Sequence, residues 1–337
     1  MEKKMPTIKE IAKRLNISIS TVSRALHDHH SIGLRTKTAV KKLAAELNYE
    51  PNQTAIFFKQ RKTFTLGVIL PNLREEFFSA AINAIDNVAL NNNYIVLTGQ
   101  SHDDLNREKS LVESMKKHRV DGILASISKN TTSFDHFEQL KNFDIPVVFF
   151  DRVPDMPDVH SVSCNLYHSS VEAVDFLVKQ GHKRIGYIQG PPTLSIRNER
   201  LNGYHDALAK HNIKPDNALI VSTDLSTEGN TNALDKLLAL KKRPTAVLLF
   251  NDYVALDVIH HARQRKLTVN KDICFVSYAN IPFMHYLDFP PIASVEQFPM
   301  EQAARAAELL FKLLDPGARE ALPPYENIVL KSELIIH

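Results

Sequence analysis

The residues best suited to chemistry lie in a short polar run near the amino terminus. Ile19, Ser20, Ser23 and Arg24 would point outward from the first turns of a helix that begins after Ser18. Small hydroxyl groups exchange hydrogen bonds with base edges, and an arginine bonds either a guanine edge or a phosphate. These residue types therefore suit contact with a DNA major groove, and both partners remain open for Arg24.

Two short helices must position these side chains. Thr7 followed by Glu10 predicts a capping box at the start of the first helix, and Asn16 can adopt the left-handed backbone that ends it. Ser18 is a suitable N-cap for the second helix, and a third helix is expected over about 36–48. The inward residues recur at helical spacing: Ile8, Ile11, Ala12, Leu15, Ile17, Val22, Ala25 and Leu26.

Charge is distributed unevenly along the 337 residues. Residues 1–63 hold 13 Lys or Arg against 5 Asp or Glu, a net charge of +8, whereas the remainder holds 28 against 33, a net charge of −5. A basic head on an acidic body is typical of a nucleic-acid reader joined to another domain. Two alternatives remain: a basic helical bundle with no role on DNA, and a head that serves protein association.

Several classes of protein are disfavoured by composition. The two cysteines, Cys164 and Cys274, lie far apart and form no disulfide or metal framework. No apolar run approaches the roughly 18–20 residues that span a bilayer, and the amino terminus lacks a signal-peptide core, so we expect a cytoplasmic protein. We find no dinucleotide or phosphate-binding loop, no metal pair and no paired catalytic groups. An enzyme acting between the lobes of the body is therefore the weakest alternative, and no cofactor is expected.

Ordered motifs along nearly the whole chain resemble the LacI/GalR family of bacterial transcription regulators. The resemblance rests on these segments: 21–26 (TVSRAL), 49–52 (YEPN), 67–69 (GVI), 150–152 (FDR), 181–185 (GHKRI), 200–204 (RLNGY), 251–252 (ND), 255–256 (AL) and 290–291 (PP). The resemblance implies a helix-turn-helix head over 1–50, a hinge helix and linker over 51–63, and an effector-binding body over 64–337. It also implies a homodimer that binds near-palindromic operator DNA, and we expect this homodimer to act as a repressor.

The hinge segment implied by the resemblance folds only on operator DNA and enters the minor groove. Phe58 sits where the family usually has a leucine wedge, and its ring can partly unstack a base step. Ile56 replaces an arginine of many members, so the operator centre would be read differently. Alternatively, the apolar residues here pack onto the body. The expected DNA contacts are Thr7, Ser18, Ile19, Ser20, Thr21, Ser23, Arg24, Asn52, Ala55 and Phe58.

Alternating strand and helix patterns from residue 64 onward predict an α/β body with parallel sheets covered by helices. The resemblance implies two lobes like those of periplasmic sugar-binding proteins. We expect the first lobe to span about 64–162 and 292–322, and the second about 163–291 and 323–337. In open parallel sheets, ligands bind beyond the carboxyl ends of the strands, so residues that follow strands are the candidate effector contacts.

Six such residues are expected to contact an effector: Phe77, Phe78, Asp151, Arg200, Asn251 and Asp252. Arg200 resembles the family's effector anchor. Four of the others have a structural alternative, since Phe77 and Phe78 can belong to the core, Asp151 can pair with Arg152 or cap a turn, and Asp252 can cap a helix.

One segment departs from the family pattern after the last core strand. Ala279 occupies the place of an aspartate that often holds a sugar hydroxyl, and Asn280 substitutes only in part. The effector is therefore expected to be a sugar or sugar derivative, with a phosphorylated or non-sugar metabolite, or a protein corepressor, as alternatives.

Overall fold

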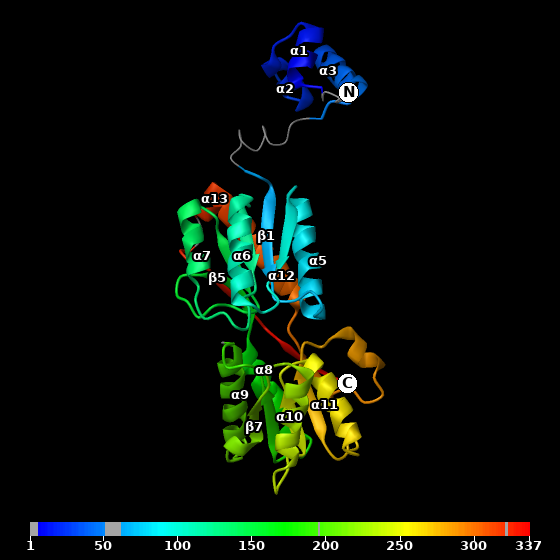
Figure 1. Ribbon diagram of the computed structural model, residues 1–337, viewed down its shortest axis with the longest axis vertical. Coiled ribbons are helices and arrows are strands. Elements are labelled where there is room, and N and C mark those ends of the chain that lie inside the picture. Colours follow the sequence, from blue (N-terminus) through cyan, green and yellow to red (C-terminus); the bar gives the residue numbers. More distant parts are fainter. Residues whose placement is uncertain (1–5, 51–61, 195, 321–322) are drawn as a thin grey trace. The chain divides into compact units, whose positions relative to one another are not determined.

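The computed structural model describes residues 6–50, 62–194, 196–320 and 323–337 (Figure 1). The chain forms two compact units, Met1–Thr63 and Phe64–His337. We call the first unit the head and the second the body.

The described part of the head, residues 6–50 and 62–63, contains three helices: α1 (Ile8–Leu15), α2 (Ile19–Leu26) and α3 (Leu34–Glu46). Ile11, Val22 and Val40, one residue from each helix, are fully buried together. The apolar spacing of the sequence thus produces one small core, around which the polar faces of the helices turn outward.

The caps of the head helices agree with the sequence except at the first. Asn16 ends α1 in the left-handed conformation, with φ of 52°, and the Ser18 side chain accepts from the Thr21 backbone N–H at 3.1 Å, so both predictions are confirmed. The capping box at Thr7 is wrong, because its side chain makes no cap hydrogen bond. Glu10 is instead bound by Arg14 at 2.6 Å, which removes the reciprocal partner.

The body contains two lobes, each built on one sheet. The first sheet is wholly parallel and has the order β11-β5-β4-β3-β1-β2. Its strands are β1 (Thr65–Leu70), β2 (Ile95–Gln100), β3 (Gly122–Ala125), β4 (Val147–Phe150), β5 (His160–Cys164) and β11 (Asn327–Leu330). Its helices are α5 (Glu76–Asn91), α6 (Leu105–Lys117), α7 (Asp135–Glu138), η1 (Gln139–Phe143), α12 (Pro299–Leu314) and α13 (Pro316–Arg319).

The second sheet has the order β12-β10-β9-β8-β6-β7, and only β12 among these is antiparallel to its neighbour. Its strands are β6 (Ile185–Gln189), β7 (Ile220–Ser222), β8 (Ala246–Leu249), β9 (Cys274–Tyr278), β10 (Ala293–Glu296) and β12 (Glu333–Ile336). Its helices are α8 (Leu166–Lys179), α9 (Ile196–Lys210), η2 (Asn217–Leu219), α10 (Thr227–Leu238), α11 (Asp252–Gln264) and η3 (Pro282–Tyr286).

Each sheet buries both of its faces. In β8, Ala246 and Leu248 belong to the core beneath α8 and α9, whereas Val247 and Leu249 belong to the core beneath α10 and α11. Successive residues of a strand point to opposite faces, so a continuous apolar run is required where helices cover both sides. The expected α/β class is confirmed.

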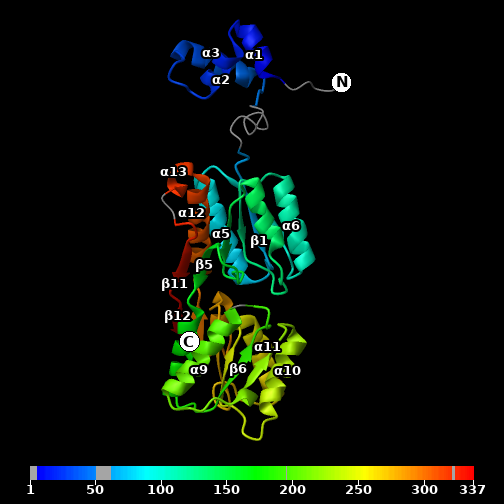
Figure 2. The same ribbon diagram turned by 90° about the vertical axis from the view of Figure 1, so that its left-hand side faces the viewer.

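The division of the carboxyl-terminal strands between the lobes differs from the expected one. We expected 293–295 in the first lobe and the whole tail in the second, but β10 pairs with β9 in the second sheet, and β11 pairs with β5 in the first. Figure 2 shows β11 and β12 following one another from lobe to lobe. A strand pattern predicts an extended segment but not the sheet edge that accepts it, because edge pairing depends on where the preceding chain crosses.

Candidate DNA-binding face and interlobe effector site

Helix α2 presents a polar face on the surface of the head. Ser20 and Arg24 are exposed and Ile19 is 46% exposed, whereas Val22 and Ala25 on the opposite side are fully buried. Ser23 is half-buried beside them. The structure therefore brings the expected base-contacting residues of α2 together on one side of a short, capped helix.

Hydroxyl groups at the start of α2 are linked to one another. Ser18 Oγ lies 2.8 Å from both Ser20 Oγ and Thr21 Oγ1 while it accepts from the Thr21 backbone. Exposed hydroxyls at a helix N-terminus, where backbone N–H groups and the helix dipole favour anions, are suited to phosphate or base contacts. Thr7, at the start of α1, is also exposed.

Cations of α3 are partly engaged within the head. Lys41 Nζ binds the Asp28 carboxylate at 2.7 Å, and Lys37 Nζ donates to the Asp28 carbonyl oxygen at 2.8 Å. The hydrogen bond from Lys41 lowers the pKa of Asp28. The other expected DNA contacts, Asn52, Ala55 and Phe58, lie outside the described residues.

Arg200 is the best-defined residue between the lobes. It projects from α9, is only 3% exposed, and donates from NH1 to the Phe250 carbonyl oxygen at 2.7 Å. Its Cζ atom lies 3.9 Å from the ring centroid of Tyr278 and 5.0 Å from that of Phe250. Its buried Nε has no hydrogen-bond partner among the described residues. Buried donors are normally hydrogen-bonded, so this group is available to a ligand acceptor.

Asp151 follows β4 at the carboxyl end of the first sheet. Its backbone is left-handed, with φ of 59°, and its carboxylate accepts only a long bond of 3.5 Å from Ser126 Oγ. Burial raises the pKa of Asp151 to about 6, although the charges of Arg152 and Arg200 oppose the rise. The expected alternative, a pair between Asp151 and Arg152, does not form, because Arg152 binds Asp103 at 2.7 Å.

The side chains of Asn251 and Asp252 form hydrogen bonds with groups of the second lobe itself. Asn251 caps α11 by accepting from the Val254 backbone N–H at 2.9 Å. Asp252 is fully buried, and its two oxygens accept from the hydroxyls of Ser277 and Ser294 and from the Ile281 backbone N–H. The expectation that Asp252 contacts an effector is therefore not met, because its carboxylate is surrounded by protein donors. It is also not the helix cap.

Phe77 and Phe78 belong to the core of the first lobe. They are 8% and 1% exposed and pack edge to face, with ring centroids 5.3 Å apart. This burial favours the structural alternative, in which both rings belong to the core, over a stacking platform for an effector. Phe78 instead lies beneath the Arg152 guanidinium, at 5.4 Å.

The segment that replaces the family's aspartate forms a strained turn after β9. Ala279 and Asn280 have φ of 101° and 49°, and a positive φ is costly for alanine. Asn280 Nδ2 donates to Glu296 at 3.0 Å, whereas its Oδ1 is buried without a partner among the described residues. Gln189 Oε1, at the end of β6, is likewise buried without a hydrogen-bond partner among the described residues.

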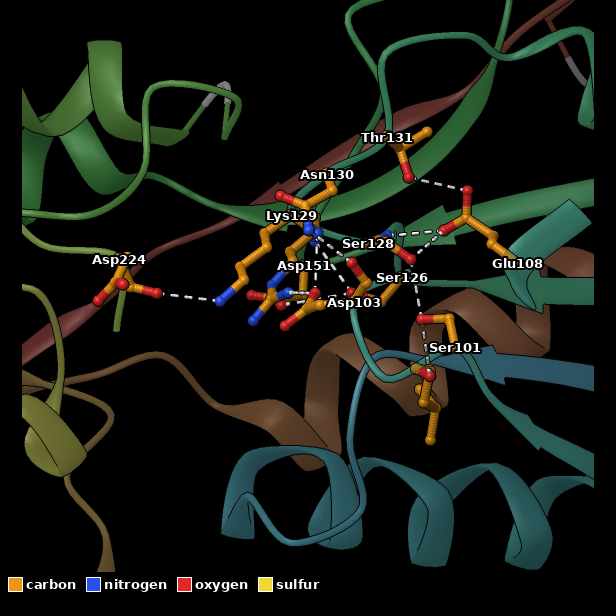
Figure 3. A network of polar contacts seen from close by, with 12 residues as sticks. Ser101, Asp103, Glu108, Ser126, Ser128, Lys129, Asn130, Thr131, Asp151 and Asp224 are labelled. Carbon is orange, nitrogen blue, oxygen red and sulfur yellow. Dashed lines mark hydrogen bonds and ion pairs between the residues drawn. The ribbon is translucent and has the colours of Figure 1, made fainter. Parts of the chain in front are cut away.

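A polar network supports the loops of the first lobe that approach the second (Figure 3). Glu108 is fully buried and accepts from Ser128 N–H at 2.7 Å, from the Ser128 and Thr131 hydroxyls at 2.8 Å, and binds His136 Nε2 at 2.9 Å. Burial opposes ionisation, but these hydrogen bonds outweigh it and lower the pKa of Glu108. The network fixes the loop that carries Lys129.

Sequence reasoning missed three polar residues of this region: Gln189, Tyr253 and Glu296. Gln189 and Glu296 are the last residues of β6 and β10, so the same rule that selected Asp151 would have found them. Tyr253 contacts Glu76 of the first lobe, which lies 177 positions away in the sequence, and no local sequence pattern predicts that contact.

A separate cavity of the first lobe lies away from these residues. It has a volume of about 470 Å³ and is lined in part by Val147, His160, Pro146 and Tyr325. Val147 and His160 begin β4 and β5, so this cavity lies at the amino ends of the strands, away from Asp151. Of the helices in the described parts of the chain, none is long and apolar enough to cross a lipid bilayer.

The fold and the two sites define a class of protein, a helix-turn-helix DNA-binding head joined to a two-lobed ligand-binding body. Comparison with known proteins agrees. Residues 7–52 match bacterial regulatory proteins of the lacI family, and residues 174–335 match a periplasmic binding protein-like domain.

Similarity to individual proteins extends over most of the chain. The transcriptional repressor CytR of Escherichia coli (strain K12) is 32% identical over 310 residues, which cover 92% of this chain and 89% of CytR. The structure of transcription regulator CcpA of Lactococcus lactis is 26% identical, with a TM-score of 0.73 over 80% of this chain and 97% of that one. The lac repressor dimer bound to operator shares the fold, with a TM-score of 0.83 at 23% identity and 98% of each chain covered.

The chain therefore belongs to the lacI family of bacterial regulatory proteins. It is a DNA-binding transcription regulator with a helix-turn-helix head and a periplasmic-binding-protein-like body.

Proposed function

We propose that this chain is a homodimeric repressor that inserts α2 into the major groove of a near-palindromic operator. Ile19, Ser20 and Arg24 contact base edges, with Ser23 beside them. The observation that supports this most directly is the exposure of these residues on α2 opposite the buried Val22 and Ala25. The positive charge of the head adds attraction to phosphates that does not depend on sequence.

The dimer follows from the symmetry of such operators. Two heads on half-sites related by a two-fold axis require two copies of the chain, and the structurally similar lac repressor binds its operator as a dimer. In this proposal Asn52, Ala55 and Phe58 contact the minor groove between the half-sites. The protein acts in the cytoplasm, where the bacterial chromosome lies.

The effector in this proposal is a small hydroxylated molecule, such as a sugar or sugar derivative, bound without turnover between the lobes near Asp151 and Arg200. The protein offers mainly acceptors there: within the described residues, the Asp151 carboxylate, Gln189 Oε1 and Asn280 Oδ1 each lack a short bond from a protein donor. Buried acceptors favour a ligand rich in O–H or N–H groups. Arg200 Nε supplies one donor for a ligand oxygen.

Selection of DNA from a random library by the full-length protein tests the DNA-binding part of the proposal. We expect enrichment of a site with two-fold symmetric half-sites, bound by two protomers. A monomeric protein that enriches no sequence at moderate salt would contradict it.

Thermal unfolding with matched compounds tests the effector part. The panel contains pentoses, hexoses and nucleosides, each with its phosphate ester. We expect an unphosphorylated compound to raise the Tm by binding the folded state. Stabilisation by the phosphate esters alone would reject a site dominated by acceptors.

A further inference from the structure

Helix α5 of the first lobe begins without a side-chain cap of its own. Glu75 occupies the N-cap position, yet its side chain accepts no cap hydrogen bond. The first N–H groups of any helix lack partners within the helix. Here the Glu76 N–H donates to the phenol oxygen of Tyr253 at 2.7 Å, and Tyr253 belongs to α11 of the second lobe. The cap of α5 thus comes from the opposite lobe.

The Tyr253 side chain is held in place by its own lobe. It is the second residue of α11, directly after the helix start that Asn251 caps. Its ring packs against the core of the second lobe and stands edge-on to Phe283, with centroids 6.3 Å apart. Burial raises the pKa of the Tyr253 phenol, so the group stays neutral and also donates to the Arg74 carbonyl oxygen, at 3.4 Å.

A second hydrogen bond joins the lobes at another pair of loops (Figure 3). Lys129 Nζ donates to the Asp224 carbonyl oxygen at 3.0 Å. The Lys129 backbone N–H is fixed by Asp103 Oδ1 at 2.8 Å, and Asp103 is held in turn by Arg152. Tyr253 and the Lys129 backbone are therefore each held in place within their own lobe, so their contacts can stabilise one arrangement of the two lobes.

We propose that Tyr253 is a closure residue whose phenol caps α5 across the lobes and, with Lys129, stabilises the arrangement in which Asp151 and Arg200 face one site. Opening the lobes breaks the cap of α5 and returns its N–H to water. In so far as the inference concerns effector affinity, it rests on the proposed function. A ligand that binds only the closed arrangement is bound less tightly when that arrangement is less populated.

Spin labels on the full-length protein test the closure directly. The labels are attached through Asn106→Cys on α6 and Asn232→Cys on α10, which are exposed, whereas the native Cys164 and Cys274 are buried. Distance distributions are compared for the labelled parent and for Tyr253→Phe, which keeps the ring but removes both hydrogen bonds. The matched control is Tyr286→Phe, because Tyr286 is 88% exposed.

We expect Tyr253→Phe to lower the ratio of closed to open molecules about fivefold, within the range known for lost helix caps. Lys129→Met should shift the distribution in the same direction, and Tyr286→Phe should leave it unchanged. A distribution for Tyr253→Phe that superposes on the parent would overturn the inference, whatever Lys129→Met does. The measurement uses neither DNA nor effector, so failure to select an operator would reject the proposed function alone.

Discussion

The guanidinium of Arg200 lies over the ring of Tyr278, with its Cζ atom 3.9 Å from the ring centroid. The Tyr278 hydroxyl is itself bound to Ser170 at 2.6 Å, and Phe250 accepts from Arg200 NH1. These contacts hold the guanidinium in place and leave its Nε without a partner in the part of the chain that the structure describes. A group oriented in this way before a ligand arrives loses little entropy on binding, which supports a role for Arg200 as an effector contact.

Replacing Arg200 with lysine should weaken effector binding much more than it destabilises the fold. Lysine has neither the planar fork nor the stacking surface, and a lost hydrogen bond to a charged group corresponds to about 1.5–3 kcal/mol. Calorimetry with a compound found to stabilise the protein measures the change. Arg263→Lys is the control, because the exposed Arg263 also lies over an aromatic ring, that of Phe289. Equal losses in both variants would reject the assigned role.

Asp151 should make stability depend on pH below neutrality. Burial raises the pKa of its carboxyl from 3.8 to about 6, so its favourable contribution is complete below pH 3.8 and is lost as the pH rises through about 6. Relative to Asp151→Asn, the free energy of unfolding of the parent should fall by about 2 kcal/mol between pH 4 and pH 7. Each pKa unit corresponds to ~1.4 kcal/mol, and the expected change is reduced because Asp151 is partly exposed.

Denaturant unfolding at several pH values measures this difference. Asp155→Asn, at an exposed position, should follow the parent at every pH. If Asp151→Asn also runs parallel to the parent across this interval, the carboxyl is not perturbed and its place in the site must be reconsidered.

The two N-caps of the head should respond differently to the same substitution. Ser18→Ala removes an acceptor of the Thr21 N–H and should lower the free energy of unfolding of the head by about 1 kcal/mol. Thr7→Ala should have a much smaller effect, because the Thr7 side chain makes no cap hydrogen bond. Thermal unfolding without DNA compares them. Similar destabilisation by both substitutions would show that Thr7 also caps its helix.

Replacing Arg24 with alanine should reduce discrimination between operator and unrelated DNA more than it reduces non-specific affinity. A side chain that bonds a base edge contributes about 1–3 kcal/mol of specificity. Titrations on both DNAs over a range of salt concentrations separate the effects. Arg14→Ala is the control, since Arg14 is exposed on α1 and paired with Glu10. Equal losses on both DNAs would make Arg24 a phosphate contact.

The sequence predicted local structure where one physical rule dominates. Asn16 and Ser18 lie where helix ends require a left-handed residue and a hydroxyl acceptor, and the apolar runs of the body matched buried parallel strands such as β1 and β8. Thr7 failed because Arg14 competes for Glu10. That competition depends on side-chain rotamers that spacing alone does not specify.

Long-range features could not be predicted from the sequence. The partner of β10 depends on the lobe to which the chain has crossed. Whether Asp252 faces a ligand depends on Ser277 and Ser294, which lie 25 and 42 positions away. Tyr253 is the clearest example. A tyrosine in the first turn of a helix indicates no contact by itself, and its partner, the Glu76 N–H, lies in the opposite lobe.

The central claim is that two heads bind one operator and that occupancy of the interlobe site controls this binding. Fluorescence anisotropy of a labelled, selected operator measures it most directly. The full-length protein is titrated at fixed, moderate salt, with and without a compound that stabilises it. We predict two protomers per operator, preference over a scrambled duplex, and a change in Kd on adding the compound that equals the change in Kd of the compound on adding operator. Equal affinity for both duplexes, or an operator Kd that saturating compound leaves unchanged, would contradict the account.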